Sequence, residues 1–87
     1  MPYKPKLLKK AEKDYEYWQK HNRDNADKID ELMEAIKVDP FKGIGKPEPL
    51  KHDLQGYWSR HITDKERILY EVVGDMVYVH RCRGHYE

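Results

Sequence analysis

Glutamate, histidine, arginine and lysine gather in the second half of the chain, and these residue types can cleave RNA without a metal ion. Such a reaction needs a base for the ribose 2′-hydroxyl, cations for the charged phosphorane and an acid for the leaving 5′-oxygen. Histidine titrates near neutrality and suits acid catalysis. The same residue types also share ordinary solvated surfaces, so composition alone leaves both interpretations open. The polar set comprises Lys46, Glu48, Lys51, His52, Arg60, His61, Arg67, Arg81, Arg83, His85 and Tyr86.

Other chemical signatures are weak. The chain contains no glycine-rich phosphate loop. His80, Cys82 and His85 lie close in sequence and could suggest zinc, but Cys82 is the only cysteine. On a regular strand, His80 and Cys82 would share a face, with His85 past the strand end. We therefore expect no metal and no cofactor.

Two helices are predicted to precede this polar set. Residues 7–21 carry Leu8, Ala11, Tyr15 and Trp18 at helical spacing, which predicts the first helix.

The second helix is expected to begin at a cap provided by Asp24 or Asn25 and to end near Val38, before Pro40. Its apolar stripe comprises Ala26, Ile29, Met33 and Ile36.

Three strands are predicted to follow a proline- and glycine-rich connection over residues 39–56. The strands span residues 57–62, 67–73 and 76–82, with a hairpin turn at Gly74-Asp75. We expect an α+β fold, with two N-terminal helices packed on one face of a small twisted antiparallel sheet. The sequence does not decide whether the start of the chain adds another strand, because Pro5 and the nearby lysines disfavour one.

The length, charge and cysteine content of the chain indicate a small single-domain protein without a strong general attraction for nucleic acid. A chain of 87 residues predicts one domain over residues 1–87. The net charge of +1 implies that any RNA affinity comes from a local basic cluster. A single cysteine, no signal-like segment and no membrane-length apolar run favour a cytoplasmic protein without membrane contact.

Several motifs together resemble the YoeB/Txe toxins of the RelE/ParE superfamily. The resemblance covers nearly the whole chain from about Leu7. The matching segments are DYEYWQ at 14–19, DPF at 39–41, GIGKPEPLK at 43–51, LQGYWSR at 54–60, RILY at 67–70 and HY at 85–86.

The resemblance implies a role for each matched residue. It makes Glu48 the general base, Arg67 the residue that steadies the phosphate, and His85 the general acid. Tyr86 would orient the substrate or the histidine, and Lys51 would contribute to the phosphate site. Further expected substrate or phosphate ligands are Lys46, Arg60, His61 and Arg83.

The resemblance also implies a biological role. Proteins of this type use a RelE/ParE-like, microbial-RNase-like sheet with helices on one face and the site on the other. They act as type II toxins that cut mRNA at the ribosome without a metal ion and so inhibit translation. The expected partners are a YefM/Phd-type antitoxin, the ribosome and mRNA, operator DNA through the antitoxin complex, and a second toxin copy.

Two departures from the family pattern carry expectations. His61 stands where a second arginine is usual, which predicts weaker phosphate binding or a steeper loss of activity as pH rises. Gly84 replaces a bulkier residue before His85 and predicts a looser backbone there.

Two other hypotheses remain open. One is a ParE-like toxin that inhibits gyrase without cleaving RNA, and the other is an inactive remnant that still binds antitoxin. The joint presence of Glu48, Arg67, His85 and Tyr86 favours the nuclease.

Overall fold

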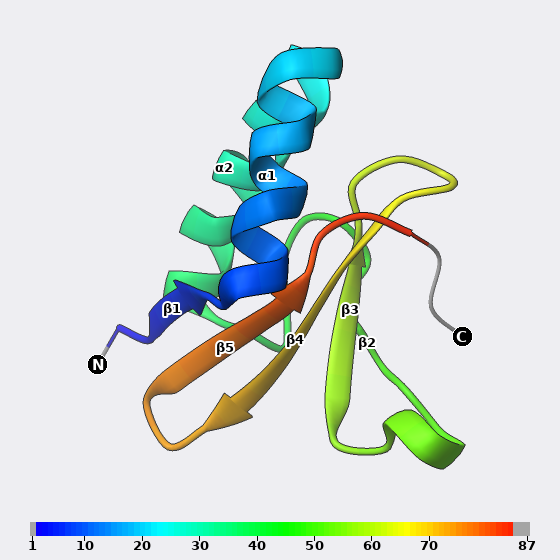
Figure 1. The fold of residues 1–87 in the computed structure, drawn as a ribbon. Helices are drawn as coiled ribbons and strands as arrows, with labels where there is room; N and C mark the ends of the chain where they lie inside the picture. Colours follow the sequence, from blue (N-terminus) through cyan, green and yellow to red (C-terminus); the bar gives the residue numbers. More distant parts are fainter. Residues whose placement is uncertain (1, 85–87) are drawn as a thin grey trace.

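Two helices connected by a single residue form the N-terminal layer of the computed structural model, which describes residues 2–84 (Figure 1). Helix α1 spans Lys9–His21, and helix α2 spans Arg23–Val38. Asn22 lies between them and serves both, because its backbone N–H donates to Trp18 and its side chain accepts from the Asn25 amide. The predicted caps Asp24 and Asn25 are therefore wrong, since the chain re-enters a helix one residue after leaving the first.

The sheet is mixed and has five strands in the order β1-β5-β4-β3-β2. The strands span Lys4–Leu7 (β1), Glu48–Pro49 (β2), Tyr57–His61 (β3), Arg67–Val73 (β4) and Met76–Arg81 (β5). The antiparallel pairing expected of the later strands is confirmed, and β2 joins them.

The N-terminal segment adds a strand that the sequence left open. Strand β1 pairs in parallel with β5, with Pro5 opposite Val77. Pro5 is tolerated because β1 lies at the edge of the sheet, where one side of the strand needs no hydrogen-bond donors.

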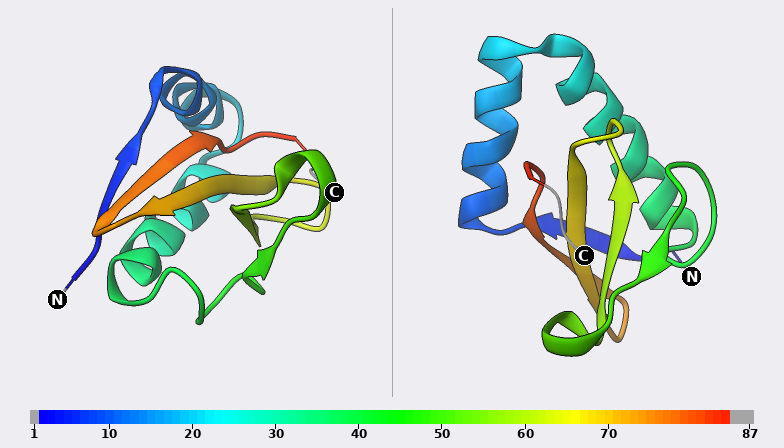
Figure 2. Two further views of the ribbon diagram at one scale, coloured as in Figure 1. Left: turned by 90° about the horizontal axis from the view of Figure 1, so that it is seen from below. Right: turned by 90° about the vertical axis from the view of Figure 1, so that its right-hand side faces the viewer.

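The two helices pack on one face of the twisted sheet, as expected (Figure 2). The core between these layers includes Leu32 and Ile36 from α2 and Ile68, Val77 and Val79 from the strands.

A smaller apolar cluster lies on the other face of the sheet. Leu50 and Leu69 form it, with Leu54 and Tyr57 packed against them. Leu54 belongs to the short 3-10 helix η1 (His52–Leu54). The helix-free face, here called the open face, is therefore partly covered by the segment that joins β2 to β3.

A register shift between β4 and β5 changes which side chains share a face. Tyr70 lies opposite Val79, whereas Leu69 lies opposite Arg81, so β5 contains one extra residue at His80. His80 contacts Tyr57 and Glu71 on the open face, whereas Cys82 belongs to the core beneath the helices. The expectation that His80 and Cys82 share a face is therefore wrong.

Candidate active site

Strand pairing places several of the expected site residues on the open face. Glu48 in β2 lies opposite Ser59 in β3, and His61 in β3 lies opposite Arg67 in β4. Directly opposed residues project to the same side of a sheet, and residues two apart on one strand do so as well. Glu48, Ser59, His61 and Arg67 therefore form a row across three neighbouring strands.

His61 lies within the electrostatic reach of the other charged residues of this row. Partial burial lowers the pKa of His61 most, and the positive charges of Arg67 and Lys46 lower it further. The carboxylates of Glu48 and Asp64 act in the opposite direction. The structure thus brings Lys46, Glu48, His61 and Arg67 together.

A tight contact between the loop and β3 places Lys46. The His61 amide donates to the Gly45 carbonyl at 2.6 Å, which ties the loop to the end of β3. Gly45 has φ +82, and a Cβ there would lie 2.7 Å from Leu32 Cδ2. Only glycine fits this position without a shift, and the exposed Lys46 follows directly with φ 52.

Arg60 does not belong to the exposed site that was expected. Its side chain is fully buried. Nε donates to the Tyr70 hydroxyl at 3.0 Å and Nη1 to the Ile44 carbonyl at 3.0 Å, while Nη2 donates to the Asp39 and Lys42 carbonyls at 2.7 and 2.9 Å. The guanidinium therefore holds the 39–44 loop, and we exclude Arg60 from the phosphate ligands.

Arg67 is positioned by the turn that precedes its strand. Its side chain is mostly buried, and Nη1 donates to the carbonyls of Thr63, Asp64 and Glu66 at 2.7, 2.8 and 3.1 Å. Its backbone amide donates to the Gly84 carbonyl at 2.8 Å. The same residue thus carries a fixed cation and anchors the C-terminal segment.

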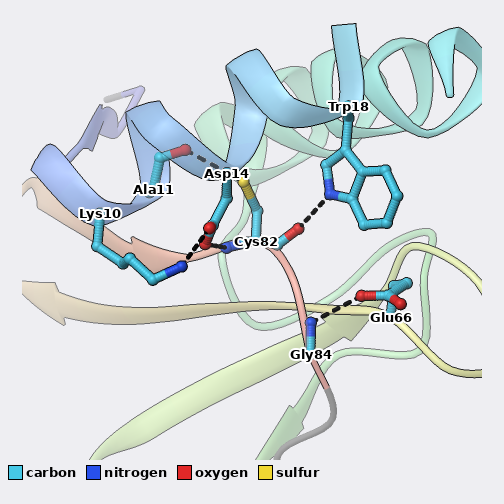
Figure 3. Close-up of polar contacts among 7 residues, drawn as sticks. All are labelled: Lys10, Ala11, Asp14, Trp18, Glu66, Cys82 and Gly84. Atoms are coloured by element: carbon cyan, nitrogen blue, oxygen red, sulfur yellow. Dashed lines mark hydrogen bonds and ion pairs between the residues drawn. The ribbon is translucent and has the colours of Figure 1, made fainter. Parts of the chain in front are cut away.

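The segment after β5 is held from two sides (Figure 3). On the helix side, Asp14 Oδ2 accepts from the Cys82 amide at 3.1 Å, and Trp18 Nε1 donates to the Cys82 carbonyl at 2.8 Å. On the sheet side, the Gly84 amide donates to Glu66 Oε1 at 2.7 Å. Gly84 has φ +115, so this hydrogen-bonded conformation favours glycine.

The loose backbone expected at Gly84 is not what the structure shows, because both of its backbone polar groups are bonded. The expected acid His85 and its neighbour Tyr86 lie outside the described residues.

The two remaining expected ligands point to different places. Lys51 is exposed and lines a shallow pocket of about 230 Å³ with Glu48. Arg83 is exposed, and its guanidinium carbon lies 3.6 Å from the ring centroid of Tyr17 in α1. Lys51 therefore lies beside the open-face row, whereas Arg83 lies against the helix layer.

Sequence reasoning missed the residues that anchor the C-terminal segment. Asp14 is 2 % exposed and also pairs with Lys10. It lies at helical spacing between Ala11 and Trp18, and this acidic residue within an apolar stripe was a signal of a buried acceptor.

Cys82 serves packing rather than reactivity. Burial raises the pKa of its thiol to about 12, and Sγ contacts the Ala11 carbonyl oxygen at 3.4 Å. A thiol that stays protonated is neither a nucleophile nor a ready metal ligand. Within residues 2–84, no three histidine, cysteine or acidic side chains are grouped closely enough to hold a metal ion. No helix in the same range is long and apolar enough to cross a membrane.

Comparisons with known proteins agree with this architecture. Residues 7–86 match the family model described as YoeB-like toxin of bacterial type II toxin-antitoxin system. Toxin YoeB of Escherichia coli K12 is 48 % identical over 73 residues, which cover 84 % of this chain and 87 % of that protein.

Solved structures show the same fold. The YoeB dimer from Staphylococcus aureus superposes with a TM-score of 0.87 at 34 % identity, covering 99 % of this chain and 100 % of that one. The YoeB chain of the YoeB-YefM complex from the same species gives 0.85 at 36 % identity, with the same coverage. Sequence and structure together establish that the chain belongs to the YoeB-like toxins of bacterial type II toxin-antitoxin systems.

Proposed function

We propose that the protein is an endoribonuclease that cleaves mRNA at the ribosome without a metal ion and thereby inhibits translation. The observation that carries this proposal is the row on the open face, where the carboxylate of Glu48 and the cations Lys46 and Arg67 all lie close enough to His61 to act on its charge. A base and phosphate-binding cations are two of the three requirements for cleavage by 2′-hydroxyl attack.

In this mechanism Glu48 takes the proton of the ribose 2′-hydroxyl, whose oxygen then attacks the adjacent phosphorus. Arg67, with Lys46 and Lys51, offsets the charge that develops on the phosphorane. The bond to the 5′-oxygen breaks, and His85 gives that oxygen a proton while Tyr86 orients the reacting groups. The products are a 2′,3′-cyclic phosphate and a 5′-hydroxyl.

The proposed partners follow from the relatives. Two solved structures of this family from S. aureus are a YoeB-YefM complex and a YoeB dimer. We extend both to this chain, with a YefM/Phd-type antitoxin as the inhibitor and a homodimer as one assembly. Operator DNA would be contacted only through the antitoxin complex, and the proposed cleavage of mRNA at the ribosome would take place in the cytoplasm.

The first test is a primer-extension assay on a defined mRNA in excess chelator, with and without translating ribosomes. The wild type should cut within the translated frame. Glu48→Gln and His85→Gln should each lower the rate by about two orders of magnitude, the usual scale for general acid–base catalysis. Glu16→Gln and His21→Gln make the same changes at exposed positions on α1 and should leave the rate unchanged.

Other outcomes would overturn this proposal. A strict requirement for magnesium would exclude the metal-free mechanism. Folded protein that makes no cuts, but arrests growth with signs of DNA damage, would favour gyrase inhibition. Folded protein without any effect would favour an antitoxin-binding remnant.

A further inference from the structure

A second cluster on the open face lies outside the proposed catalytic row. It surrounds a pocket of about 300 Å³ between η1, β3, β4 and β5, with Lys10 at the start of α1 also lining it. The floor is apolar and consists of Leu54, Tyr57 and Leu69. The rim is polar and is formed by Lys10, Asp53, His80 and Arg81.

The His80 ring is held in place as one wall of this pocket. Its Nε2 lies 2.8 Å from Glu71 Oε1, and both side chains are about one-third exposed or less. On its other side, the ring centroid lies 5.0 Å from that of Tyr57, with the planes tilted by 45°. An imidazole with a fixed carboxylate partner presents a rigid flat surface beside a second aromatic ring.

The lining defines the chemistry of the occupant. Two aromatic rings over an apolar floor suit a flat aromatic group, and unpaired nucleobases stack on such rings. Lys10 and Arg81 on the rim suit an attached phosphate. Lys10 pairs with the buried Asp14, yet its side chain is 60 % exposed and faces solvent at the rim. The carboxylate of Asp53 on the same rim would repel a bound phosphate.

The strands connect this pocket to the catalytic row. Glu71 follows Arg67 by four residues on β4, and Tyr57 precedes His61 by four residues on β3. Four residues of strand span about 13 Å. A single RNA strand lying along β3 and β4 would therefore cross both places.

We propose that this pocket is a subsite for one nucleotide of single-stranded RNA that flanks the cleaved bond. This inference rests on the proposed nuclease function, which it deepens. Nucleotides held there anchor the substrate at a distance from the reacting phosphate, so the pocket contributes to affinity and to the length preference of cleavage on free RNA.

Binding without cleavage gives the direct test. Single-stranded 2′-deoxy oligonucleotides of mixed sequence cannot be cleaved by 2′-hydroxyl attack, and fluorescence anisotropy can compare a dinucleotide with a hexanucleotide. The wild type should bind the hexanucleotide about tenfold more tightly, the scale of stacking one base. His80→Ala and Arg81→Ser should remove most of that gain and leave dinucleotide binding unchanged.

Matched controls and a gain-of-affinity variant sharpen the test. Arg23→Ser removes a guanidinium from α2 and should keep the full length effect. Asp53→Asn should strengthen hexanucleotide binding several-fold, because it removes the opposing charge, whereas Asp27→Asn on α2 should not. In the wild type, amide chemical shifts of Leu54, Tyr57 and His80 should move with the hexanucleotide.

The results separate this inference from the catalytic proposal. A hexanucleotide that binds no better than the dinucleotide, or a gain that survives both His80→Ala and Arg81→Ser, would overturn the subsite even if mRNA is cleaved. A length effect located at the pocket would support the subsite even if the protein proved unable to cut RNA.

Discussion

Arg60 and Arg67 both come from segments that resemble the family motif, yet the structure gives them different tasks. Arg60 points to the helix side of the sheet, where backbone carbonyls and the Tyr70 hydroxyl surround its guanidinium. Arg67 lies on the open face, opposite His61. Successive side chains of a strand point to opposite faces of the sheet, and this alternation separates the two arginines. Which face each arginine occupies follows only from the pairing of the strands, which the sequence does not show.

The buried Arg60 predicts a stability effect. Arg60→Met leaves several loop carbonyls without a donor and should lower the free energy of unfolding by at least about 3 kcal/mol. Tyr70→Phe removes only the 2.6 Å bond to the Pro40 carbonyl and the acceptor for Arg60 Nε, and should cost about 1–2 kcal/mol. Urea unfolding measures both values. An Arg60→Met protein as stable as the wild type would mean that the guanidinium is not structural.

His61 predicts a pH dependence. Its pKa lies below the ordinary value because of partial burial and the nearby Arg67 and Lys46, so its cation is lost as pH rises through that lowered pKa. Near neutrality His61 therefore adds little positive charge to the site. His61→Arg should match wild-type kcat/KM at low pH and exceed it by up to about tenfold above neutrality. A constant ratio across pH 5 to 8 would show that the charge of His61 is not used.

At the scale of elements, the last segment depends on two neighbours that are distant in sequence. Helix α1 holds Cys82 through Asp14 and Trp18, and the turn before β4 holds Gly84 through Glu66. These contacts connect the start of the chain to its end. The resemblance to the family led to His85 as the proposed acid, but neither residue pattern nor spacing shows which side chains hold the segment before it.

The Glu66 contact predicts a local change in backbone protection. Glu66→Ala removes the acceptor at 2.7 Å and should make the Gly84 amide exchange with solvent about tenfold faster or more. Glu66→Gln keeps an acceptor oxygen and should restore most of the protection. Hydrogen exchange followed by NMR measures this, with the Trp18 indole N–H as an internal reference. Equal exchange in all three proteins would mean that the contact does not hold Gly84.

The helix and strand periods were sufficient to predict two helices and three antiparallel strands, and the helix ends near His21 and Val38 were correct. Strand β1 was harder to predict, because Pro5 and the two lysines Lys4 and Lys6 disfavour a strand that its parallel pairing with β5 stabilises. The extra residue at His80 could not be predicted from the sequence either, because a bulge is defined by how the strand pairs with its partner strand.

At the scale of the whole molecule, the layers and the charge restrict how RNA can bind. The helices occupy one face of the sheet, so the RNA of the proposed reaction would lie on the open face (Figure 1). The chain has 17 basic and 16 acidic residues, so it lacks a general attraction for phosphate. Binding to free RNA then depends on a few local cations, and the proposed ribosomal location compensates for that weakness.

This balance predicts a shallow salt dependence. With about four phosphate contacts at about −0.7 each for a single strand, log K for free RNA should change with log salt at a slope near −3. Lys51→Gln should reduce that slope by about 0.7, because Lys51 is proposed to contact phosphate. Lys37→Gln makes the same change on α2, where Lys37 pairs with Glu34, and should not alter the slope. Titrations of an uncleavable oligonucleotide between low and physiological salt measure these slopes. A slope steeper than about −6 would require a far wider basic surface than the open face offers, and would move the RNA path away from the row of Glu48, His61 and Arg67.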